Sequence, residues 1–277
     1  MSDPSIVIAD DTLDAQETAF MEKQHMEKRR LMGQLEWASP EILKVPLVFV
    51  GVGSVGSFGL FAVAKMGCTD ITLIDSDHFE EHNIASQFCL EKTSLGKAKI
   101  LEAGKLAMAF APIPLDIKTI QGKVMGDSIV PEGLTEEPST PLSKVFRGII
   151  ICSPDSMVPR RESFEAAKKN PGVTGFIDIR VAGQNLQVFL VDFQNQKGIE
   201  HYEASLYSNE EGFTPLCGAR SIIFTSMIAG AWAAKAVQML VKGVDHADEY
   251  KIDVESGWGQ QMRNGKLCMS PIDMLEV

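Results

Sequence analysis

The chain has 277 residues, of which 45% are hydrophobic and 23% charged, and its formal net charge is −11. This length and composition are typical of a globular protein with one large α/β domain or two small ones. The acidic balance argues against a nucleic-acid partner, because phosphate backbones are bound by clustered lysines and arginines. The first residues have neither a basic start nor a long apolar core, so we expect no secretory signal.

The cysteines are odd in number, lie far apart and form no Cys-x-x-Cys pair. This pattern is typical of free thiols in a reducing compartment, and not of a disulfide framework or a zinc knot. We therefore expect a cytoplasmic protein. The five are Cys68, Cys89, Cys152, Cys217 and Cys268.

In chain order, residues 1–40 are predicted to form an N-terminal helical arm. The segment 12–37 is charged and helix-favouring, with a partial apolar stripe. It carries two arginines, Arg29 and Arg30. Residues 41–277 are predicted to form the main domain.

The stretch that organises the main domain is a glycine turn between two apolar runs. The first run ends in Gly51, Gly53 and Gly56, spaced as GxGxxG, and the second ends on Asp75, 19 positions after the last glycine. Strand, glycine turn, helix and strand in this order predict a nucleotide-binding βαβ unit. The free amides at the start of the helix favour an anion. A dinucleotide fits this unit as well as ATP does, so an NAD-dependent oxidoreductase remains an alternative.

After this unit, segments with helical periodicity and segments with strand periodicity follow one another along the chain. They predict an α/β fold with a Rossmann-like, doubly wound, mostly parallel sheet and an antiparallel extension. The expected elements are a helix opening near 97–99, a strand at 117–120, a loop-rich linker at 122–143, a strand at 145–152, a helix at 159–169, strands at 175–179 and 186–192, a polar loop at 195–215, an apolar helix at 221–241, and final strands at 250–254 and 265–269.

The apolar helix at 221–241 is long enough to cross a bilayer. Lys235 and Gln238 lie inside it, and charged residues are rare within membrane spans. We therefore interpret it as a buried helix and expect no membrane association. Together with the helical arm, it leads us to expect a homodimer.

Polar motifs recur after the glycine turn at fixed spacing. Asn83, Ser86 and Gln87 lie in one short motif, and Lys99 follows 13 residues after Ser86. With Cys152, Asp155, Arg160 and Cys217 further on, the chain resembles the ThiF/MoeB/HesA family of adenylating enzymes, which are related to ubiquitin-activating enzymes. The resemblance runs from about residue 45 to 243.

The resemblance implies ATP-dependent adenylation of the C-terminal carboxylate of a ubiquitin-like or ThiS/MoaD-like sulfur-carrier protein, with Mg²⁺. It further implies the following roles: Gly51, Gly53, Gly56, Asn83 and Gln87 at the nucleotide, Asp75 on the ribose, Lys99 on the α- and β-phosphates, Asp155 on Mg²⁺, Arg160 as a catalytic cation, and Cys217 as a nucleophile that forms a thioester or persulfide.

Three departures from the family pattern matter. One of them, an Asp-Asn pair that is stretched by Pro154 and reads Asp155-Ser156, only loosens the alignment. Ser86 stands where the family has an arginine that contacts the ATP phosphates, so a non-catalytic scaffold that binds a ubiquitin-like protein is an alternative. Candidates to replace the arginine are Lys97, Arg160, Arg29 and Arg30. The Cys-x-x-Cys pairs of zinc-binding members are missing, so we expect no structural zinc.

The individual site residues also admit structural explanations. Asp75 could be an ordinary acid at a strand end, and Lys99 a solvated lysine on a helix. Asp155 could cap the helix that follows it. Cys217 could be a packing residue, as most buried free cysteines are.

Overall fold

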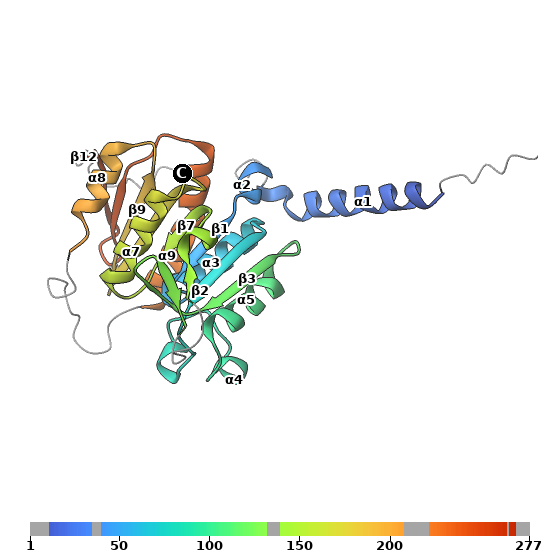
Figure 1. Cartoon of the computed structure of the whole chain (residues 1–277), viewed down its shortest axis with the longest axis horizontal. Helices are drawn as coiled ribbons and strands as arrows, with labels where there is room; N and C mark the ends of the chain where they lie inside the picture. The colour runs from blue at the N-terminus through green and yellow to red at the C-terminus, as the bar shows by residue number, and fades with distance from the viewer. Residues whose placement is uncertain (1–10, 35–39, 132–138, 208–221, 265, 270–277) are drawn as a thin grey trace, which may run out of the picture.

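The computed structural model describes residues 11–34, 40–131, 139–207, 222–264 and 266–269 (Figure 1). Within them a nine-stranded sheet runs in the order β12-β11-β10-β9-β8-β7-β1-β2-β3, with helices on both faces. This arrangement confirms the predicted Rossmann-like α/β fold.

Five neighbouring strands, in the spatial order β8-β7-β1-β2-β3, form the parallel part of the sheet. Three of them, β1, β2 and β7, are almost entirely buried, which is why they appear in the sequence as continuous apolar runs. Their carboxyl ends lie at one edge of the sheet, where open α/β folds bind ligands. The strands are β1 (Leu47–Val50), β2 (Asp70–Asp75), β3 (Asp116–Gln121), β7 (Gly148–Cys152) and β8 (Val173–Ala182).

The other strands extend the sheet antiparallel from β8, as predicted. A tight turn at Gly183, whose φ is +61°, reverses the chain between β8 and β9. The strands are β9 (Asn185–Asp192), β10 (Glu249–Asp253), β11 (Trp258–Arg263) and β12 (Lys266–Met269).

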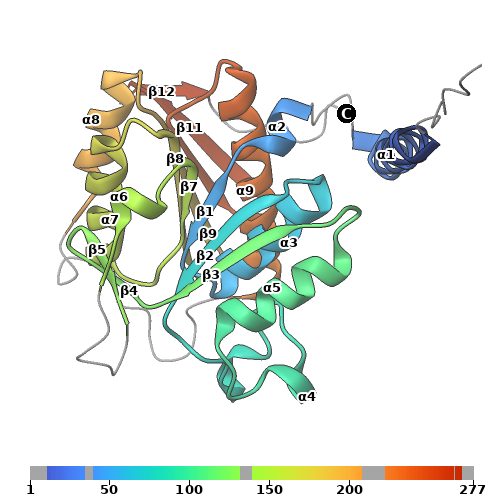
Figure 2. The ribbon, with the colours of Figure 1, turned by 45° about the vertical axis from the view of Figure 1, so that its right-hand side comes forward.

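The helices divide between the two faces of the sheet (Figure 2). One face is covered by α3 (Ser54–Met66), α5 (Lys99–Phe110) and α9 (Ile223–Lys242). The other is covered by α6 (Leu142–Val145), α7 (Met157–Lys169) and α8 (Gln196–Ala204). Each face has its own apolar core, so the sheet separates two hydrophobic layers.

Helix α9 is long and apolar enough to cross a membrane, but half of its most apolar window is buried inside the protein. It packs against α3 at close range, since a Cβ on Gly230 would lie 2.5 Å from Phe58 Cβ. Lys235 Nζ donates a hydrogen bond to Gln238 Oε1 at 2.9 Å, one turn further along α9. These contacts are those of a core helix.

The N-terminal helix α1 (Asp11–Arg30) runs away from the main domain (Figure 1). After it, Leu31 is buried against Gly67. A short 3-10 turn (Met32–Gln34) and α2 (Pro40–Lys44) lead into β1. The boundary between arm and domain at residue 40 stays a prediction. The remaining short helices are η2 (Glu81–Asn83) and α4 (Glu91–Ser94).

The predicted linker at 122–143 contains more order than expected. It forms a separate three-stranded sheet of β4 (Lys123–Met125), β5 (Ser128–Val130) and β6 (Thr140–Pro141). Val124 and Ile129 are buried opposite each other across the turn at Gly126. Two buried residues on three-residue strands are too short a signal for periodicity to detect.

The prediction of a polar loop at 195–215 was wrong for its first part, because this part forms α8. The Asn195 side chain accepts a hydrogen bond from the Gly198 amide and caps the helix. Ile199 and Tyr202, three residues apart, are buried on the inner face. Strand β11 was also not predicted, because its half-exposed sequence alternates weakly.

The contact between α3 and α9 yields a stability prediction. Gly230→Ala should lower the free energy of unfolding by about 1–3 kcal/mol, because the added methyl forces two backbones apart. Gly33→Ala is the control, since a Cβ there meets nothing within 4 Å. Denaturant unfolding of both variants measures the difference. Equal stability of the Gly230 variant and the parent would contradict this packing.

Candidate functional site

The glycine turn after β1 leaves open space at only one of its glycines. Gly51 has φ +90° and no room for a side chain, since a Cβ would lie 2.9 Å from Pro154 N. A Cβ on Gly56 would lie 2.1 Å from Gly51 O. Around Gly53, by contrast, a Cβ would meet nothing within 4 Å, and no side chain caps the start of α3 there. There is therefore room for a ligand beside Gly53, at the start of α3, where uncapped amides favour an anion.

Asp75, at the end of β2, is bonded to this turn. Its Oδ2 accepts from Val52 N at 2.6 Å, and its Oδ1 accepts from Asp77 N at 2.8 Å. Burial raises the pKa of Asp75 above its ordinary value, although both amide bonds act in the opposite direction. The carboxylate therefore stabilises the glycine turn through these two bonds. Each oxygen keeps a second lone pair, which can accept a hydrogen bond from a ribose hydroxyl.

Lys99 opens α5 beside the same strand end. Its side chain is only 8% exposed, and Nζ lies 3.0 Å from Asp77 Oδ2. Burial opposes ionisation of Asp77, but the hydrogen bond and charge of Lys99 outweigh it, so the pKa of Asp77 lies below its ordinary value. Lys99 is therefore not a solvated surface lysine.

The motif from Asn83 to Gln87 folds over the start of α3. Asn83 is buried, and its Oδ1 accepts from Glu80 N at 3.0 Å. Phe88 N donates to Ser57 Oγ at 3.0 Å, which ties the motif to α3. Gln87 Oε1 is buried without a hydrogen-bond partner among the described residues. An orphaned buried acceptor of this kind calls for a ligand or a water.

Asp155 lies in the turn after β7. Its side chain is exposed, and the part of the chain that the structure describes gives its carboxylate no hydrogen bond or ion pair. Ser156, not Asp155, is the N-cap of α7. The turn is held against the glycine turn, because Ser153 Oγ donates to Gly51 O at 3.1 Å.

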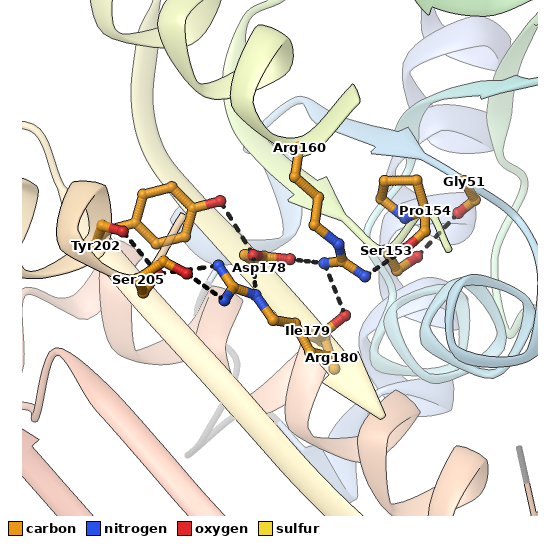
Figure 3. A network of polar contacts seen from close by, with 9 residues as sticks. All are labelled: Gly51, Ser153, Pro154, Arg160, Asp178, Ile179, Arg180, Tyr202 and Ser205. Atoms are coloured by element: carbon orange, nitrogen blue, oxygen red, sulfur yellow. Dashed lines mark hydrogen bonds and ion pairs between the residues drawn. The ribbon is translucent and has the colours of Figure 1, made fainter. Parts of the chain in front are cut away.

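Arg160 lies behind this turn and points into the protein (Figure 3). It pairs with the fully buried Asp178 of β8 and donates to the carbonyls of Ile179, at 3.2 Å, and of Pro154. This placement differs from the expectation that Arg160 takes the place of the arginine missing at Ser86.

Magnitudes favour Arg160 staying where it is. Pulling one partner out of a buried ion pair costs about 3–5 kcal/mol. One donor to a developing charge in a transition state contributes ~2–4 kcal/mol. The two magnitudes are similar, and Asp178 would keep Arg180 as a partner. Moving Arg160 would in addition break its bonds to the carbonyls of Ile179 and Pro154, so a phosphate contact brings no net gain.

The remaining predicted cations, Arg29, Arg30 and Lys97, take no part in the contacts described above. Cys217 lies outside the described residues. Arg29 and Arg30 are on α1, and Arg30 donates to Pro112 O at 3.1 Å, on the connection between α5 and β3. Lys97 is exposed and lies 4.0 Å from Glu102.

Two acids that pair with cations at or behind the site were not singled out in the sequence. Asp77 carries a visible signal, since it forms an Asp-x-Asp pair with Asp75 at a strand end. Asp178 is the single acid in the apolar run GFIDI, and a buried acid implies a cationic partner. Neither pattern says which cation it meets.

The family comparison agrees with this geometry. The sequence profile of the ThiF family matches residues 33–264. The chain belongs to the ThiF family. Membership supports an ATP-using adenylyltransferase that acts on a carboxylate. No sequence among curated proteins matches this chain.

Solved structures share the fold at low identity. E. coli MccB with AMPCPP and MccA is 16% identical with a TM-score of 0.61, over 86% of this chain and 68% of that one. E. coli MccB with ATP is 16% identical with a TM-score of 0.60, over 87% and 69%. PaaA is 13% identical with a TM-score of 0.59, over 97% and 79%.

Thiol reactivity follows from the environments of the cysteines. Burial raises the pKa of Cys68 to about 12 and also raises the pKa of Cys152, so both are thiols at pH 8. Cys89 is half-buried, with its pKa raised by burial, and Cys268 is exposed.

Among the four described cysteines, we expect iodoacetamide at pH 8 to modify Cys268 before Cys89 and to leave Cys68 and Cys152 unmodified in the native protein, because only the accessible thiolate reacts. Peptide mass spectrometry measures each site, and the unfolded protein is the control. Rapid labelling of native Cys68 would contradict its burial.

Proposed function

We propose that the chain is an ATP-dependent adenylyltransferase that activates the C-terminal carboxylate of a ubiquitin-like or ThiS/MoaD-like carrier protein. The observation that most supports this proposal is the buried Lys99 ammonium at the strand ends, beside Asp75 and Asp77. The NAD-dependent alternative would leave both Lys99 and Asp155 without a role.

The reaction requires little from the side chains. A substrate carboxylate is ionised at pH 7 and needs no general base. It attacks the α-phosphorus of ATP, a new C–O–P bond forms, and pyrophosphate leaves with the electron pair of the broken P–O bond. Catalysis is then a matter of positioning and of neutralising charge on the phosphates.

The residues present suit these tasks. The open space at Gly53 and the uncapped amides of α3 receive phosphate oxygens. Lys99 neutralises their charge. Asp75 and the orphaned Gln87 Oε1 accept hydrogen bonds from the nucleoside.

A magnesium site with one protein ligand fits Asp155. The described residues contain no cluster of three His, Cys, Asp or Glu that could hold a metal by itself. Mg²⁺ in nucleotide enzymes is commonly held by one or two carboxylates together with substrate phosphates, and Asp155 is exposed and unpaired. When bound, the ion supplies positive charge to the departing pyrophosphate.

The carrier and the compartment are parts of the same proposal. MccB has been solved together with MccA, which supports a polypeptide partner for this fold. The four described cysteines are free thiols, which supports the cytoplasm. After adenylation, the Cys217 thiolate would attack the acyl adenylate, form a thioester and release AMP. Persulfide transfer through Cys217 would in addition need a sulfane-sulfur donor.

A non-catalytic scaffold is a second candidate, and Ser86 favours it. A half-buried serine occupies the position of the family arginine. Losing one such contact lowers the rate by about 10²–10³-fold if nothing replaces it. Lys97 and an arm arginine remain candidates for its replacement.

ATP–pyrophosphate exchange separates the two candidates. With a carrier protein present, we expect exchange by the parent chain and a loss of at least about 10²-fold in Asp155→Ala, because the metal loses its protein ligand. Asp116→Ala is the matched control, since this exposed acid lies at the opposite end of the strands, on β3.

Carrier binding without exchange would support the scaffold. In that case Ser86→Arg is the decisive variant, because a restored arginine should create exchange if it is the missing part. Binding of NAD with no binding of ATP would contradict the adenylyltransferase and support the NAD-dependent alternative.

We also propose a homodimer. The first turns of α9 expose three large apolar side chains, Ile223, Phe224 and Met227. Contiguous exposed apolar residues are typical of interaction surfaces.

Phe224→Asp should therefore shift the mass in solution from dimer to monomer at about 10 μM, because a charge would have to be buried in the interface. Met125→Asp is the control, because this methionine on β4 is also exposed but lies on a different element. Sedimentation velocity measures both. A monomeric parent chain would contradict the proposal.

A further inference from the structure

A buried charge network lies directly behind the turn that carries Asp155. At its centre is Asp178, whose side chain is 0% exposed. Besides Arg160, it accepts from Arg180 Nε at 2.8 Å and from Tyr202 Oη at 3.0 Å (Figure 3). A carboxylate without access to water requires this degree of pairing.

The two arginines share Asp178 but hold different segments. Arg180 donates from its two terminal nitrogens to the carbonyl and the hydroxyl of Ser205, both at 3.0 Å, and so fixes the end of α8. Arg160 donates to the carbonyl of Pro154, on the opposite side of the network. Only Arg160 therefore reaches the turn after β7.

The Pro154 carbonyl links Arg160 to the backbone of Asp155. It belongs to the same planar peptide unit as the backbone nitrogen of Asp155, so fixing that oxygen fixes the plane from which Asp155 departs. On its other side, the turn is held by Ser153 N, which donates to Val50 O at 2.9 Å. Asp155 is thus exposed in its side chain but anchored in its backbone.

We propose that Arg160 is a positioning residue for Asp155. Held by Asp178, it fixes the Pro154–Asp155 peptide and keeps Asp155 on the turn that packs against the glycine turn, where its carboxylate would hold the metal of a bound nucleotide. The guanidinium itself stays inside the protein and touches no phosphate. This inference rests on the proposed ATP-dependent function.

Arg180 provides a matched control, because Arg160→Lys and Arg180→Lys each weaken one ion pair with Asp178. Only Arg160→Lys also loses the bond to Pro154, since one ammonium cannot span both acceptors as a guanidinium does. Circular dichroism and thermal unfolding establish that each variant folds. Arg160→Gln is the second variant if the lysine protein does not fold.

The first measurement needs no nucleotide. In hydrogen–deuterium exchange of the full chain, Arg160→Lys should raise the exchange rate of the peptide that contains residues 153–156 by at least about 10-fold. Arg180→Lys should leave this peptide within about 3-fold of the parent. Equal effects of the two variants would overturn the inference, because the network would then be only structural.

The second measurement uses Mn²⁺ as the probe, with AMPCPP as the nucleotide, followed by EPR. We expect Arg160→Lys to weaken Mn²⁺ binding at least 10-fold, while AMPCPP affinity in EDTA changes less than 3-fold. An equal loss of AMPCPP affinity in EDTA would show a direct phosphate contact and overturn the inference. Unchanged Mn²⁺ binding would overturn it as well.

The two measurements distinguish failure of the inference from failure of the proposed function. If the parent chain binds neither Mn²⁺ nor AMPCPP, the ATP-dependent function and the metal role of Asp155 are contradicted together. If the parent binds both and the two lysine variants behave alike, only the positioning role of Arg160 is contradicted.

Discussion

The site depends on one close approach between two backbones. Gly51 lies against the Ser153–Pro154 backbone with no room for a Cβ, and Gly56 lies against the carbonyl of Gly51. A side chain at either glycine would separate the turn after β1 from the turn after β7. In the proposed function, the amides that bind phosphate come from the first turn and the Asp155 carboxylate comes from the second. This backbone contact then sets the distance between them.

The electrostatics of the site are unusual for an anion-binding protein. Three carboxylates, Asp75, Asp77 and Asp155, lie at the strand ends, and Lys99 is the buried cation among them. In the proposed function, the attraction of the described residues for phosphates therefore comes largely from backbone amides and from the Mg²⁺ ion bound with the nucleotide. This balance explains how a chain with a net charge of −11 can present a nucleotide site.

The sequence predicted those parts of the fold that long patterns encode. Buried parallel strands form continuous apolar runs, and the glycine spacing marks the turn at Gly51–Gly56, so the parallel half of the sheet was correct. Helix α8 and the small sheet of β4, β5 and β6 were not found, because each buries only two or three side chains. The direction of Arg160 was also beyond prediction, since it depends on Asp178, 18 residues away and on another element.

The two outermost strands of the sheet have a consequence for how the protein behaves at high concentration. Strand β3 is mostly polar on its exposed positions and carries Lys118, and β12 begins with Lys266. Unpaired strand edges tend to join the edges of other sheets, and charged side chains, lysine above all, suppress that pairing. The sheet can therefore extend to nine strands without offering a flat apolar border on which copies of the chain would aggregate.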